Sequence, residues 1–198
     1  MKLLKGCDFD RAQKRLGFDR EADGALAVDF LGRRWRISHN GVEAVTGKDT
    51  DDGVFEVNTR SVLGYYALSE ADCEPEMDFY PINHFSHGIF EGGGAGYGDG
   101  LARLFREATG GEYKRFAAGA ERLGLVFEKE REPGKYVWSY RLFPKLPVKV
   151  VYYEGDEDFP SDIKVLYDRT APIFFKFEPL AVLSNCFIQA LCHAARAG

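Results

Sequence analysis

The chain has 198 residues, of which 45% are hydrophobic and 14% aromatic, a composition that excludes an intrinsically disordered protein. A chain of this length can bury about 70% of the surface that its unfolded form exposes, so we expect a single globular domain over residues 1–198. The formal net charge is −5, from 26 basic and 31 acidic residues, and this balance argues against a nucleic-acid partner, which a positive field would attract.

The first residues are not expected to act as a targeting signal. Met1–Cys7 ends in Leu-Lys-Gly-Cys and resembles the end of a bacterial lipoprotein signal. Such a signal needs an apolar core of about 7 to 15 residues, whereas only Leu3 and Leu4 are available here. No run in the chain approaches the ~20 apolar residues that cross a bilayer. We therefore expect a cytoplasmic protein with no membrane partner.

The first part of the chain contains signals for two helices and a hairpin. Apolar residues at helical spacing predict a helix over Asp8–Phe18, with Asp8 as its cap. Strict alternation over Leu26–Ile37, interrupted at Gly32, predicts a β-hairpin. A second helix is predicted over Asn58–Ser69, capped by its first residue, and an acidic connector follows up to residue 78.

The second half of the chain predicts further helices and a sheet. Helical spacing recurs around residues 101–105 and again over Tyr113–Leu123. Alternation over Tyr136–Phe143 and Val148–Tyr153 predicts strands, and a helix that is apolar on nearly all sides follows over Leu180–Ala195. This order predicts an α+β fold, with a mainly antiparallel sheet of four or more strands, packed helices and a buried C-terminal helix.

A glycine-rich stretch lies between the predicted connector and the helix near residue 101. Its six glycines at 92, 93, 94, 96, 98 and 100 fail the register of a dinucleotide-binding fingerprint, and the stretch lacks the lysine of a P-loop. We interpret it as a loop that Asp99 caps at the start of a helix, with a lid over a ligand as the alternative. In that alternative, Tyr97 is a ligand-binding candidate.

Two histidines, His84 and His87, precede these glycines and are candidates for binding a ligand or a metal ion. A metal site would need at least one more ligand, from Cys73, Asp78, Glu91 or His39, and none of these falls into a recognised ligand spacing. We therefore predict no bound metal. Should one bind, these two histidines with a nearby carboxylate are the expected ligands.

The acidic residues after the strand ending at Tyr153 form a second candidate site. Five acids occur in the nine residues Glu154–Asp162, and such a cluster could raise the pKa of one carboxyl or hold a divalent cation, with Asp156 as a candidate. We interpret the segment as a solvated turn that ends the strand, with the acidic site as the alternative. Asp168 ends the apolar run Ile163–Tyr167, where a buried carboxylate would need a partner, and is a further ligand-binding candidate.

The four cysteines show no metal-binding or redox spacing. They are Cys7, Cys73, Cys186 and Cys192, and no two are arranged as Cys-x-x-Cys. A chain with this much core material has little need of a disulfide framework, so reduced and mostly buried thiols are expected.

The segment Val151–Leu183 resembles the C-terminal signature of the domain-of-unknown-function family 3786. In that signature a strand leads into Gly-Asp-Glu-x-Phe-Pro, here Gly155–Pro160, then into an aliphatic run ending in aspartate and a last helix. The segments around Gly64–Tyr66 and 83–97 resemble the middle of the family. The resemblance assigns no catalytic residues. Some relatives carry an additional cysteine-rich iron–sulfur module, which implies a link to anaerobic redox or corrinoid metabolism; this chain lacks those cysteines.

These observations lead to three functional hypotheses. The first is a small-ligand-binding or accessory module, whose partner would be a small molecule or another protein and whose cofactor and oligomeric state stay open. The second is a metal-assisted hydrolase that uses His84 and His87 to activate a water molecule. The third is a structural subunit of a larger complex.

Overall fold

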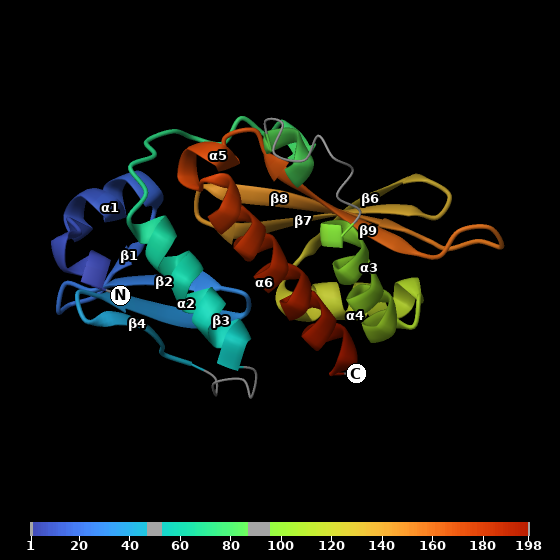
Figure 1. Cartoon of the computed structure of the whole chain (residues 1–198), viewed down its shortest axis with the longest axis horizontal. Helices are drawn as coiled ribbons and strands as arrows, with labels where there is room; N and C mark the ends of the chain where they lie inside the picture. The colour runs from blue at the N-terminus through green and yellow to red at the C-terminus, as the bar shows by residue number, and fades with distance from the viewer. Residues whose placement is uncertain (1, 47–52, 87–95, 198) are drawn as a thin grey trace.

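The computed structural model describes residues 2–46, 53–86 and 96–197 (Figure 1). Its helices are the 3-10 helices η1 (Lys2–Gly6) and η2 (Ile82–Phe85) and the α-helices α1 (Phe9–Leu16), α2 (Gly53–Ala67), α3 (Gly96–Thr109), α4 (Tyr113–Leu123), α5 (Ala171–Phe174) and α6 (Phe177–Arg196). Its strands are β1 (Asp19–Arg20), β2 (Leu26–Phe30), β3 (Arg33–Ser38), β4 (Gly41–Ala44), β5 (Phe79–Pro81), β6 (Val126–Glu132), β7 (Lys135–Phe143), β8 (Leu146–Tyr153) and β9 (Asp162–Asp168).

These strands form two antiparallel sheets. The N-terminal sheet has the order β1-β2-β3-β4, and the C-terminal sheet has the order β5-β9-β8-β7-β6. The long helix α6 runs across the C-terminal sheet, and α2 lies beside it over the N-terminal sheet (Figure 1). This architecture confirms the predicted α+β fold with antiparallel sheets.

The first helix and the first hairpin were predicted correctly from local sequence signals. The side chain of Asp8 accepts a hydrogen bond from the backbone N–H of Arg11 at 3.0 Å and caps α1, as predicted. The hairpin of β2 and β3 is also confirmed. Its turn is formed by Leu31 and Gly32, which both adopt positive φ angles, 51° and 74°. Such turns match the right-handed twist of the two strands they join.

Helix α2 begins at Gly53, five residues before the predicted cap Asn58, which lies inside the helix. The reason is packing. Phe55, Thr59, Val62 and Tyr66 are buried on one side of α2, so the apolar side that holds the helix in place begins well before Asn58. Tertiary burial therefore outweighed the local capping signal.

One face of the C-terminal sheet carries the helices. The ring of Phe116 in α4 stacks on Tyr152 of β8, with 4.9 Å between the ring centroids, and Phe187 in α6 stacks on Tyr140 of β7 at 5.5 Å. Helices α4 and α6 approach each other closely at Gly119. A Cβ atom at this position would lie only 2.7 Å from the backbone nitrogen of Ala195, so a larger residue does not fit there. The buried C-terminal helix is confirmed, and its first residue is Phe177 rather than Leu180.

The edge strand β6 was not predicted. All seven of its residues are exposed, so it lacks the alternation of buried and exposed positions by which strands are recognised. Charged residues fill positions 128–132, and its pairing with β7 contains two register shifts. Charges and bulges of this kind discourage the pairing of an edge strand with another chain.

The two sheets are joined by a stack of aromatic rings around Phe143. This residue, at the end of β7, stacks on Phe30 of β2 at 4.7 Å and on Tyr66 of α2 at 4.1 Å. All three rings are fully buried. The hydroxyl of Tyr66 donates a hydrogen bond to the carbonyl of Leu16 at 2.9 Å, which ties α1 to the same stack. The buried hydrophobic core is thus continuous between the sheets.

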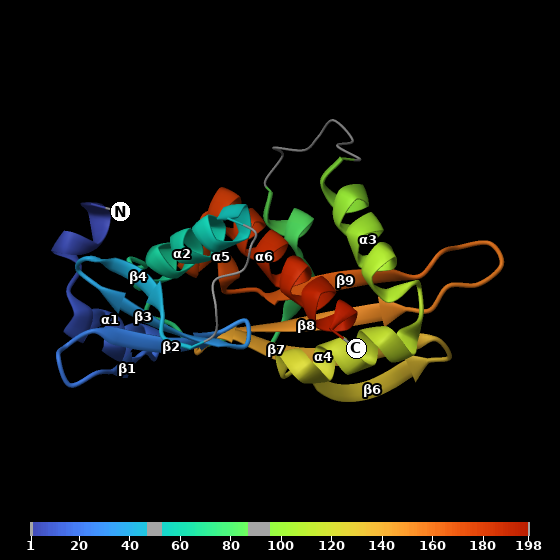
Figure 2. The same cartoon turned by 90° about the horizontal axis from the view of Figure 1, so that it is seen from below.

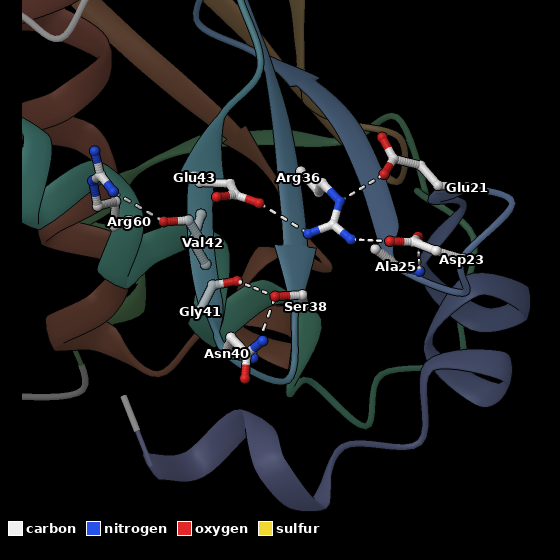
Figure 3. A network of polar contacts seen from close by, with 10 residues as sticks. All are labelled: Glu21, Asp23, Ala25, Arg36, Ser38, Asn40, Gly41, Val42, Glu43 and Arg60. Atoms are coloured by element: carbon white, nitrogen blue, oxygen red, sulfur yellow. Dashed lines mark hydrogen bonds and ion pairs between the residues drawn. The ribbon is translucent and has the colours of Figure 1, made fainter.

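The outer face of the N-terminal sheet carries a network of ion pairs centred on Arg36 (Figure 3). Its guanidinium contacts the carboxylates of Glu21 at 2.8 Å, Glu43 at 2.9 Å and Asp23. These contacts raise the pKa of Arg36, while the backbone N–H of Ala25, followed by Arg36, lowers the pKa of Asp23. The acidic side chains thus offset the positive charge of Arg36 on this face.

Within the described ranges, no helix combines the length and apolarity that a membrane span requires.

The two tryptophans allow a test of the single-domain expectation, because Trp35 lies in the N-terminal sheet and Trp138 in the C-terminal sheet. In the variants Trp35→Phe and Trp138→Phe, the remaining tryptophan reports on one sheet. We expect the urea transition of its fluorescence to coincide with the urea transition of the whole chain followed by circular dichroism. Adding Phe143→Ala should lower the free energy of unfolding by about 3 to 5 kcal/mol in both backgrounds. Separate transitions for the two sheets would contradict this.

Candidate functional site

A pocket of about 310 Å³ lies along the edge of β9, between η2, α3 and α6, and we call it the edge pocket. Its apolar lining is provided by Ile82, Leu101, Ala102, Ile163, Val165 and Ile188. The segments that form it are far apart in the sequence, and the figures place α3 and α6 beside β9 in both views (Figures 1 and 2). A pocket of this size with a mostly apolar lining is typical of small-molecule sites.

The pocket exists because β5 is too short to cover β9. Strand β5 pairs only with residues 166–168, and among the described strands none pairs with residues 162–165 on that side. The backbone N–H of Arg169 donates to the carbonyl of Asp78 at 2.7 Å, on the β5 side. Since backbone groups alternate in direction along a strand, those of Ile163 and Val165 point the same way, into the pocket.

Polar groups occupy two positions in the lining. Ser184 of α6 is 4% exposed and brings a hydroxyl to the pocket, and Asp162 brings a carboxylate at its end. Lys164 also borders the pocket, but its ammonium lies over the ring of Tyr153, 5.2 Å from the centroid. The pocket can therefore combine an apolar ligand body with hydrogen bonds from the strand backbone and from Ser184.

The pocket was not predicted from the sequence. Its lining residues come from four separate segments, which are brought together by the pairing of β5 with β9 and by the packing of α3 and α6. One signal was available, because Ser184 interrupts the otherwise apolar side of α6 between Leu183 and Phe187. A hydroxyl in a buried position needs a partner, which makes such a residue a candidate for binding.

The predicted candidate His84 lies on η2 but outside the lining of the edge pocket. Its ring is exposed and stacks on Tyr80 of β5, with 4.2 Å between the centroids. His87 lies outside the described residues. In the described part of the chain, no three histidine, cysteine, aspartate or glutamate side chains are placed to share a metal ion.

Tyr97 lies in the first turn of α3, and its side chain is outside the described part. The helix begins at Gly96, so Asp99 is its fourth residue and does not precede the helix as the predicted cap would.

Asp168 is the last residue of β9, whereas Asp156 lies in the loop before its first residue, so the two do not form one site. A strand of this length separates its ends by about 20 Å. Asp156 is exposed in the β8–β9 loop, where its carboxylate accepts hydrogen bonds from the backbone N–H groups of Asp158 and Phe159 at 2.9 and 2.8 Å. This geometry is the solvated turn that the sequence favours over an acidic site.

Asp168 is fully buried and its carboxylate accepts four hydrogen bonds. Two come from the backbone N–H and the hydroxyl of Thr170, at 3.0 and 2.7 Å, and two from the backbone N–H groups of Glu76 and Met77, at 3.2 and 2.6 Å. Met77 has a φ angle of 61°, which is rare for a residue with a side chain. Asp168 thus fixes the connector where it enters β5.

The carboxylate of Asp168 can be tested by replacement with asparagine. The asparagine amide has only one oxygen that accepts hydrogen bonds, and its NH₂ group faces backbone N–H groups that are themselves donors. Asp168→Asn should therefore lower the free energy of unfolding by about 2 to 3 kcal/mol. Asp156→Asn is the matched control and should change it by less than about 0.5 kcal/mol. Urea unfolding measures both. Equal effects of the two substitutions would contradict the structural role of Asp168.

Comparison with known proteins identifies the family but no characterised relative. The family model described as a domain of unknown function, DUF3786, matches residues 8–190, which is nearly the whole chain. No curated protein matches the chain, and no solved structure does either. The resemblance inferred from the segment 151–183 is thereby confirmed. The chain belongs to the DUF3786 family.

Proposed function

We propose that this protein is a small-ligand-binding module and that the edge pocket is its binding site. The observation that supports the proposal is the uncovered part of β9, where the backbone of Ile163 and Val165 meets an apolar hollow with one buried hydroxyl, that of Ser184. Ligand sites commonly combine an apolar lining with a few polar groups that orient the ligand.

The size of the edge pocket limits the ligand. A volume of about 310 Å³ corresponds to roughly ten water molecules, so a compact molecule fits within it. We therefore propose that any link to anaerobic redox or corrinoid metabolism runs through a small metabolite or a partner protein. In this proposal the chain is a cytoplasmic accessory module, and the corrinoid is bound elsewhere.

The cysteines favour an accessory role over thiol chemistry. All four are free, and burial is the main cause that raises the pKa of each of them, to about 11 for Cys186 and Cys192. A raised pKa keeps a thiol protonated and so removes the reactive thiolate. The chain's own thiols are therefore poor nucleophiles at neutral pH.

The edge pocket can be tested by filling it. Ala102→Phe places a ring in the pocket and should abolish the binding of small apolar probes such as indole and p-cresol, measured by saturation-transfer NMR. Ala118→Phe, at a half-buried helical position on α4 outside the pocket, is the matched control and should bind like the wild type. Thermal unfolding of both variants establishes that they fold.

Two results would contradict this proposal. One is the absence of saturation transfer from any apolar probe to the wild type. The other is probe binding that Ala102→Phe and Ala118→Phe reduce equally, because the probe would then bind outside the edge pocket.

The thiols can be tested by alkylation of the native protein with iodoacetamide at pH 8. Because a pKa near 11 leaves about a hundredfold less thiolate than an ordinary cysteine has, Cys186 and Cys192 should react far more slowly than Cys73, which is half-buried. Mass spectrometry of peptides gives the rates. In urea all four cysteines should react at similar rates, and rapid native labelling of Cys186 would contradict the prediction.

A further inference from the structure

A second hollow, of about 510 Å³, lies where α3 ends and the chain turns into α4, and we call it the α3–α4 corner. Its lining includes Arg103, Arg106, Glu107, Gly110, Gly111 and Ser161. It faces the base of the long β8–β9 loop, which projects away from the sheet (Figure 2). None of these residues belongs to the edge pocket.

The α3–α4 corner carries an excess of positive charge. Arg103 forms an ion pair with Glu107 at 3.6 Å, one turn later in α3. Arg106, which is half-buried, makes no ion pair with any described residue. The lining therefore has two guanidinium groups and one carboxylate, and the charge of Arg106 is available to a ligand.

The corner also contains a buried hydroxyl that lacks a hydrogen bond. Ser161 is 3% exposed, and its Oγ atom has no hydrogen-bond partner of normal geometry among the described residues. The hydroxyl of Tyr152 lies near enough for Ser161 to lower its pKa, which burial raises, but it donates its own hydrogen bond to the carbonyl of Gly111 at 2.8 Å. Leaving a buried hydroxyl unpaired is costly, so its presence points to a missing partner.

Glycine keeps the space in front of this hydroxyl open. A Cβ atom at Gly111 would lie 3.3 Å from the Oγ atom of Ser161, and the φ angle of Gly111 is 76°. A larger residue would be strained there and would also fill the hollow between Ser161 and α3.

From these contacts we propose that the α3–α4 corner binds a compact oxyanion of the phosphate class, held by Arg106 and Ser161. Guanidinium groups donate paired hydrogen bonds to phosphate oxygens, and a serine hydroxyl can donate a third. A simpler role for Arg106 is to stabilise the C-terminal end of α3 by its charge. That role explains neither the unpaired hydroxyl of Ser161 nor the hollow beside it.

The corner lies next to the edge pocket, since Ala102 and Asp162 line the pocket while their neighbours Arg103 and Ser161 line the corner. A phosphate monoester with an apolar group could therefore occupy both. The proposal goes beyond the proposed function and does not depend on it, because the corner has its own charge and its own donor.

The test is a titration of ¹⁵N-labelled protein with inorganic phosphate at constant ionic strength, followed by amide chemical shifts. We expect saturable shifts at Gly110, Gly111 and Ser161. Arg106→Gln should weaken binding about tenfold, and Ser161→Ala should weaken it severalfold. Arg131→Gln is the matched control, since it removes the same charge from an exposed position on β6 and should leave the affinity unchanged.

A substitution that is expected to strengthen binding serves as a second test, because loss of the fold could not produce that result. Glu107→Gln removes the negative charge that competes for Arg103, so it should strengthen phosphate binding by about threefold. Phenyl phosphate distinguishes the two sources of the anion. If phenyl phosphate binds more tightly than phosphate and Ala102→Phe removes this difference, the ligand is a monoester that spans both hollows. If the two bind equally, the ligand is the free anion.

The proposal is overturned if phosphate produces no saturable shifts at the corner, or if Arg106→Gln and Arg131→Gln bind phosphate alike. It is also overturned if Arg106→Gln lowers only the thermal stability, as a role limited to the end of α3 requires. Failure of indole to bind the edge pocket, with phosphate binding intact, would reject the proposed function and leave the anion subsite standing.

Discussion

The architecture depends on the ring of Phe143, which is packed between an element of each sheet. Phe30 contacts it from the N-terminal sheet, and Tyr66 contacts it from α2. Because aromatic rings bury large areas and prefer defined stacking geometries, this contact fixes how the two sheets are placed relative to each other. Tyr66 lies near the end of α2, so the same contact also anchors this helix, from which the connector leads to β5.

Much of the fold could be predicted from local patterns. The parts that could not be predicted have one physical cause in common. The cap at Asp8 and the turn at Gly32 depend on neighbouring residues, so the sequence reveals them. Helix α2 and strand β6 are decided by distant packing: the first is longer than its cap signal because its apolar side is buried, and the second is held by β7 while fully exposed.

The candidate site was harder to predict than the fold, because it is made by contacts between four segments that are about 20 to 100 residues apart. Asp168 illustrates the difficulty. Its position after an apolar run correctly indicated a buried carboxylate with partners, but those partners are backbone N–H groups of the connector. The same signal of a polar side chain in apolar surroundings, applied to Ser184 in α6, indicates the edge pocket, whereas Ser161, between Pro160 and Asp162, carries no such signal.

The two edges of the C-terminal sheet also bear on how the protein behaves at high concentration. On one side, β6 presents charges and register shifts, and on the other, β5 is three residues long and ends in Pro81, which has no N–H to offer a further strand. Both edges therefore resist the edge-to-edge pairing of sheets from different chains that starts fibre growth. The recess beside Ile163 and Val165 can leave a strand backbone accessible to a small ligand with little risk of recruiting another copy of the chain.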